Sequence, residues 1–78
     1  MRSFLVESYT PRSAAVGDIE ARARDAASGT SVRYVRSIFV RNDEICLHLI
    51  DAPSSSDVGD VIRAAGIVAQ RIVEVDET

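Results

Sequence analysis

The 78-residue chain contains no lysine, one cysteine and no long apolar run, and each of these absences argues against a class of protein. All nine basic residues are arginine and the net charge is -3, so there is no basic tract that would bind nucleic acid phosphates. A single cysteine excludes a disulfide within the chain. No apolar run approaches the roughly 20 residues of a membrane-spanning helix, and no basic amphipathic segment predicts attachment to a membrane surface.

The remaining composition is that of a folded protein. Hydrophobic residues make up 46% of the chain and charged residues 27%, which argues against disorder. A chain of this length is expected to form one domain over residues 1–78. Its core is necessarily thin, so a partner subunit would add to its stability. No signal peptide is recognisable, and we therefore expect a cytoplasmic protein.

Six elements are predicted from apolar periodicity and turn-forming residues. The first is a strand at 3–9, followed by a helix from Ser13 to about Ala27 that ends at Gly29. Two strands at 31–41 and 44–51 then form a hairpin with a tight turn at Asn42 and Asp43. The second helix begins with a capping box of Ser54 and Asp57 and ends at Gly66, and the last strand is at 71–75. With right-handed crossovers this order predicts an α+β, ferredoxin-like βαββαβ fold, with an antiparallel sheet and both helices on one face.

The predicted hairpin of residues 31–51 decides which side chains share a face of the sheet. A turn at residues 42 and 43 pairs residue 41 with 44, 39 with 46, 37 with 48 and 35 with 50. The more apolar face is expected to pack against the helices, and it carries Tyr34, Arg36, Ile38, Val40, Ile45, Leu47 and Leu49. The other face is expected to be open, and it carries Val35, Ser37, Phe39, Arg41, Glu44, Cys46, His48 and Ile50.

The predicted open face is too apolar to be simply solvated. Val35, Phe39, Cys46 and Ile50 would form an exposed patch of the kind that marks an interface. We therefore expect a homodimer in which two open sheet faces, or a cavity that they share, lie between the subunits.

Cys46 and His48 are the only cysteine and histidine of the chain, and they fall on one side of one strand. Neighbouring residues on that side are roughly 6.6 Å apart, so these two could share a metal ion, whereas Glu44 could hardly join them. Further ligands would have to come from Glu7 or from a second subunit. The alternative is that Cys46 is a small buried hydrophobe and His48 a hydrogen-bonded sheet residue.

The same face predicts a small-ligand site made by Glu7, Ser37, Phe39 and His48. An enzymatic alternative is a small dimeric α/β-barrel protein, similar to monooxygenases or isomerases, in which Glu7 and Glu74 beside His48 carry out acid and base chemistry. The competing interpretation is that both glutamates stay solvated. Ser37 lies opposite His48, but no third member is evident and a hydrolytic triad is not expected.

Two families with this element order are excluded by their motifs. An RNA-recognition motif needs aromatic stacking residues on its third strand, and "EICLHLID" has none. Metallochaperones of this topology carry C-x-x-C, which one cysteine cannot supply.

A third family is similar along almost the whole chain. The resemblance rests on short motifs in a fixed order: "FLVESY", Tyr34, Ser37, Val40, "DEIC", Asp51–Pro53 and "AAGIVAQRIVEV". It is a small bacterial domain-of-unknown-function family described as nickel-binding and ferredoxin-like. The resemblance implies a homodimer, no established catalytic activity, and nickel or another divalent metal at the surface of some members. A position where that family often has histidine is Ile62 here. Because nickel favours imidazole, one histidine weakens the metal expectation.

Overall fold

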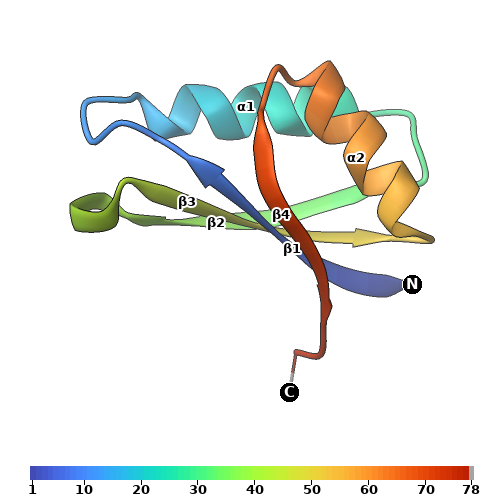
Figure 1. Cartoon of the computed structure of the whole chain (residues 1–78). Helices are drawn as coiled ribbons and strands as arrows, with labels where there is room; N and C mark the ends of the chain where they lie inside the picture. The colour runs from blue at the N-terminus through green and yellow to red at the C-terminus, as the bar shows by residue number, and fades with distance from the viewer. Residues whose placement is uncertain (78) are drawn as a thin grey trace.

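The computed structural model describes residues 1–77, and it confirms the predicted element order (Figure 1). The elements are β1 (Arg2–Tyr9), α1 (Val16–Ala27), β2 (Arg33–Val40), a short 3-10 turn (Arg41–Asp43), β3 (Ile45–Ala52), α2 (Ser55–Ala64) and β4 (Ala69–Val75). No helix within residues 1–77 is long and apolar enough to cross a membrane.

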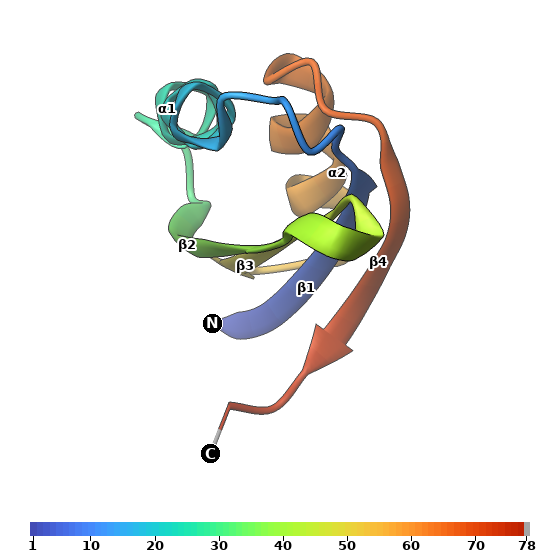
Figure 2. The same cartoon turned by 90° about the vertical axis from the view of Figure 1, so that its left-hand side faces the viewer.

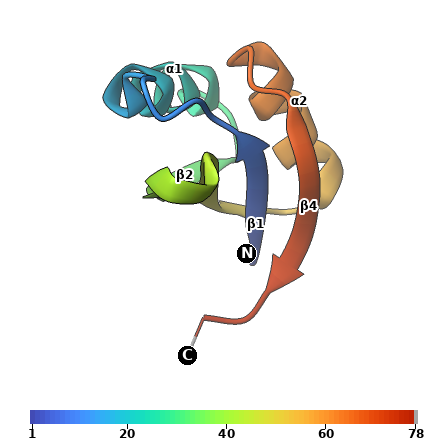
Figure 3. The same ribbon diagram turned by 60° about the vertical axis from the view of Figure 1, so that its left-hand side comes forward.

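The four strands form one antiparallel sheet in the order β2-β3-β1-β4. The first and third strands are central, and β2 and β4 form the edges. Both helices cover the same face, while the opposite face has no helix over it (Figures 1 and 2). Figure 3 shows the edge strand β4 running alongside β1 beneath α2. This is the ferredoxin-like arrangement expected from the sequence.

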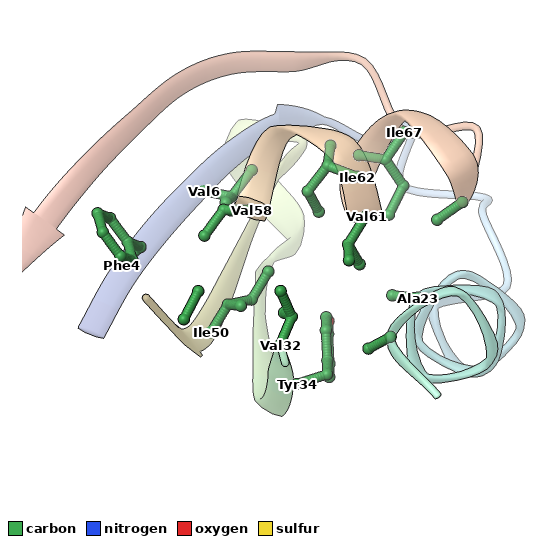
Figure 4. Close-up of a cluster of buried hydrophobic side chains, with 13 residues drawn as sticks. Phe4, Val6, Ala23, Val32, Tyr34, Ile50, Val58, Val61, Ile62 and Ile67 are labelled. Atoms are coloured by element: carbon green, nitrogen blue, oxygen red, sulfur yellow. The ribbon is translucent and has the colours of Figure 1, made fainter. Parts of the chain in front are cut away.

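The core lies between the two helices and the covered face of the sheet (Figure 4). The second helix contributes most of its apolar side chains, because Val58, Val61 and Ile62 are buried, as is Ala65 just beyond its end. The first helix supplies only small buried residues, Ala23 and Ala27. This difference lets α1 approach the sheet with polar side chains, and these matter for the site described below.

The two helices begin differently from one another. Ser13 was expected to cap α1, but the helix begins at Val16 after Ala15, without a side-chain cap. The predicted cap of α2 is confirmed: Ser54 Oγ accepts a hydrogen bond from the Asp57 backbone N–H at 3.3 Å, and its hydroxyl donates to the Asp57 carboxylate at 2.8 Å.

Replacing Ser54 with alanine is expected to lower the free energy of unfolding by about 1 kcal/mol, because one N–H of the first turn loses its acceptor. Urea unfolding followed by circular dichroism measures the change. Ser56→Ala, at an exposed position of the same helix, is the control, and an equal loss in both variants would contradict a capping role.

The register of the hairpin is confirmed at its centre, where Phe39 pairs with Cys46 and Ser37 with His48. Two details differ from the prediction. The chain makes a 3-10 turn at residues 41–43 followed by Glu44 in the left-handed conformation, with φ 54°. The pairing also shifts between Tyr34 and Arg36, so that Tyr34, in place of Val35, lies opposite Ile50.

The prediction of which face of this hairpin meets the helices was wrong. Cys46 and His48 are fully buried, whereas Ile38 is 51% exposed. The side chains on the helix-covered face are those of Tyr34, Ser37, Phe39, Cys46, His48 and Ile50. Those on the open face are Arg36, Ile38, Val40, Ile45, Leu47 and Leu49. The prediction assumed that the more apolar face is the covered one. Here the covered face includes a polar network, and the open face is the more apolar of the two.

Candidate functional site

His48 lies at the centre of a buried polar cluster under the helices. Its side chain is fully buried, and both ring nitrogens have partners. Nε2 is 3.2 Å from Ser8 Oγ on β1, and Nδ1 is 2.5 Å from the Tyr34 hydroxyl on β2. The ring of Tyr34 meets the imidazole edge to face, with centroids 5.7 Å apart. Three strands therefore fix the position and orientation of this imidazole.

The cluster continues from Tyr34 to the first helix. The Ser37 hydroxyl donates to Glu20 Oε2 at 2.7 Å, and Arg24 donates to Glu20 Oε1 at 2.9 Å. These two partners, Ser37 first, hold the pKa of Glu20 below its ordinary value. Burial raises the pKa of Tyr34 to about 12, against an opposing hydrogen bond with Ser37. At neutral pH the cluster therefore ends in a charged carboxylate and contains a protonated phenol.

The charged carboxylate sets the direction of the hydrogen bond with Ser37. An ionised carboxylate only accepts hydrogen bonds, so the proton of Ser37 points to Glu20. A neutral imidazole donates from one ring nitrogen and accepts at the other, and burial lowers the pKa of His48, which favours this neutral form. Tyr34 and Ser8 therefore have opposite roles: one hydroxyl donates to His48 and the other accepts from it.

Cys46 is a buried free thiol beside this cluster. Burial, and secondarily the negative charge of Glu20, raise the pKa of the thiol. A protonated thiol is a poor metal ligand, because metals bind the thiolate. No group of three or more histidine, cysteine, aspartate or glutamate side chains within residues 1–77 is placed to hold a metal ion.

The structure separates the other predicted site residues. Glu7 is on the open face beside Arg71, with 3.9 Å between the charged atoms, so the sheet lies between Glu7 and His48. Glu74 is paired with Arg2 at 2.8 Å. Phe39 is on the covered face but near the turn, where Arg41 stacks over its ring at 4.8 Å. Of the predicted ligand-binding residues, only Ser37 and His48 belong to the same cluster.

Glu44 is also remote from the predicted metal pair. Its carboxylate accepts a hydrogen bond from the Arg12 backbone N–H at 2.9 Å. This contact ties the turn after β2 to the loop after β1. The expectation that spacing keeps Glu44 apart from Cys46 and His48 agrees with this placement.

A cavity of about 370 Å³ opens at the end of β1, where Ser8 forms part of its wall. It is bounded by α1 and by the loop between α2 and β4. Its polar lining includes Ser8, Arg22 and Gln70, and its apolar lining includes Ile19, Ile67 and Val68. The buried cluster therefore borders a space large enough for a small molecule, through Ser8.

Sequence reasoning missed this cavity. The i, i+4 spacing of Asp18 and Arg22 would predict an ion pair on the solvated face of the helix, and no such pair occurs among residues 1–77. The residues of the lining come from segments far apart in the chain. No local spacing connects Ser8 with Arg22 or Ile67, and only the folded chain brings them together.

One solved structure has the same fold over nearly its full length. The crystal structure of SCO4226 from Streptomyces coelicolor A3(2) matches with a TM-score of 0.87 and 16% sequence identity, covering 97% of this chain and 98% of that chain. No protein-family model and no curated protein matches this sequence. At this identity the likeness shows the fold alone, so the resemblance to a nickel-binding family is supported only as far as the fold.

Proposed function

We propose that this protein is a homodimeric small-molecule-binding protein. The observation that carries the proposal is the cavity beside Ser8, whose volume of about 370 Å³ lies within the range typical of ligand sites. Like most such sites it combines an apolar wall with a few polar groups. Its polar wall includes a hydroxyl that the buried cluster holds in place, which favours binding of one ligand geometry.

The dimer is proposed from the open face of the sheet. Ile38 and Val40 are 51% and 37% exposed there. Leu47 lies opposite Ile38, and the neighbouring row on the same face pairs Leu49 with Leu5 and Leu5 with Val73. An uncovered apolar face of this extent on a small domain favours an interface. A second copy is the occupant that best fits it, because a twofold axis pairs the same patch with itself.

The charges around the open face also suit a second copy. Arg36 pairs with Glu77 at 3.1 Å, and Arg71 lies beside Glu7. Both signs of charge therefore border the apolar patch, and a twofold arrangement can bring unlike charges opposite each other. A partner with one sign of charge would meet repulsion from half of this border.

A nickel site made by Cys46 and His48 is the second candidate, favoured by their positions on the same side of β3. It requires His48 to release Ser8 or Tyr34 and Cys46 to lose its proton. Because both steps cost free energy, we expect calorimetry with Ni²⁺ at pH 7 to show no affinity tighter than roughly 10 µM. A dissociation constant for Ni²⁺ below roughly 10 µM, if the binding disappears in Cys46→Ala, would establish the metal site instead.

A further inference from the structure

The lining of the cavity beside Ser8 contains groups specific enough to indicate a class of ligand. We propose that it binds a small carboxylate that has an apolar body and a hydroxyl or amino group. This inference rests on the proposed small-molecule function and gives the ligand its chemistry. Three features of the lining carry it: the charge of Arg22, the hydroxyl of Ser8, and the apolar wall.

Arg22 supplies a positive charge that forms no ion pair among the described residues. It lies in the cavity lining and is exposed, and none of the ion pairs within residues 1–77 includes it. By contrast, Arg24, two residues further along α1, is held by Glu20. A guanidinium can bind a carboxylate through two parallel hydrogen bonds. A single arginine matches a ligand with one negative charge.

Ser8 lines the cavity and brings a hydroxyl to it. Its Oγ is 3.2 Å from His48 Nε2, and a hydroxyl can make further hydrogen bonds both as donor and as acceptor. A ligand O–H or N–H group beside Ser8 can therefore bind to it whichever ring nitrogen of His48 carries the proton. A site built around a hydrogen bond of this kind disfavours analogues that lack the partner group.

The apolar wall fixes the body of the ligand. Ile19 and Ile67 line the cavity, and Val68 in the same lining is 82% exposed. An aliphatic or aromatic body that covers Val68 would remove this exposed surface from water. A fully polar ligand such as a sugar would gain nothing from that contact.

Four related compounds with the same apolar body test the charge and the hydroxyl separately. These are 4-hydroxybenzoate, 3-hydroxybenzoate, benzoate, which lacks the hydroxyl, and 4-hydroxybenzamide, which lacks the charge. We expect at least one hydroxybenzoate to bind at least tenfold more tightly than benzoate and than 4-hydroxybenzamide, as measured by calorimetry and by NMR shifts of residues in the lining. If all four bind with equal affinity, the class proposed is wrong but the cavity is still a ligand site. If none binds, the small-molecule function fails as well.

Two variants assign the contacts. Arg22→Gln is expected to weaken hydroxybenzoate binding at least fivefold while leaving 4-hydroxybenzamide unaffected, and Arg33→Gln, the same change at an exposed arginine near the other end of the sheet, is expected to change neither. Ser8→Ala is expected to remove the preference for hydroxybenzoate over benzoate. Because Ser8→Ala also unpairs His48, its folding is checked by circular dichroism; Arg22→Gln is a surface change and tests the proposal independently. Equal losses in Arg22→Gln and Arg33→Gln would overturn the role of Arg22.

Discussion

Ile38→Glu is expected to convert the protein from a dimer to a monomer. In sedimentation experiments at about 10 µM protein, the mass should fall from twice the chain mass to the chain mass of 8.5 kDa. The physical reason is that a twofold axis would bring two glutamates into the same apolar interface. Uncompensated interfacial charges typically cost 2–5 kcal/mol, which weakens association by roughly thirtyfold or more.

Val68→Glu is the matched control, because Val68 is 82% exposed but lies in the cavity lining on the helix side. It introduces the same charge and should leave the dimer intact. A wild-type protein that is monomeric at this concentration would contradict the proposed dimer. A dimer that survives Ile38→Glu would place the interface away from the open face.

The folded state is expected to lose stability as the pH falls below 6.5, with a slope of up to about 1.4 kcal/mol per pH unit. Burial lowers the pKa of His48 below its ordinary value of 6.5. Between the folded and unfolded pKa values the unfolded chain therefore binds one more proton than the folded chain, and acid favours unfolding. At pH values above the pKa of His48 in the unfolded chain, the ring is neutral in both states. Its contribution to the free energy of unfolding then no longer changes with pH.

His48 is the only histidine, so the slope can be assigned to it. The pKa values of Glu20 and Glu74 are held below their ordinary 4.5, and the stability that they contribute is lost only at pH values lower than this. Urea unfolding at fixed protein concentration between pH 7 and pH 5 measures the slope. In His48→Gln it should vanish, even though the variant is less stable overall.

A second measurement does not depend on the variant. The ¹⁵N chemical shifts of the His48 ring should show more than half of the rings neutral at pH 6.5, and they identify which ring nitrogen carries the proton. A mostly charged ring at that pH would contradict the lowered pKa of His48.

The element order and most of the hairpin register could be predicted from the sequence because both depend on local signals. Alternation predicts the strands, Ser54 caps α2 as expected, and Gly29 and Gly66 have the positive φ angles expected beyond helix ends. The start of α1 could not be placed as well, since Ser13 makes no cap and the helix begins after Ala15 without a side-chain cap.

The orientation of the hairpin faces could not be predicted, because periodicity shows which residues share a face but not which face meets the helices. Counting apolar residues gave the wrong answer. Leu47 and Ile38 are on the open face, while the polar His48 and Ser37 are covered because partners from β1, β2 and α1 satisfy them. The contact between Ser8 and His48 depends on the pairing of β1 with β3, forty residues apart in the chain, for which no local signal exists.

The irregularity in β2 between Tyr34 and Arg36 has a consequence for comparing this protein with others. Tyr34 and Ser37 point to the same side of the sheet although three positions separate them, so Val35 is an additional residue in the strand. A protein that has this fold and the same hydroxyl pair, but a regular second strand, would be one residue shorter at this point. Sequence alignments should place a single-residue gap there, and an alignment without it would compare covered positions with open ones.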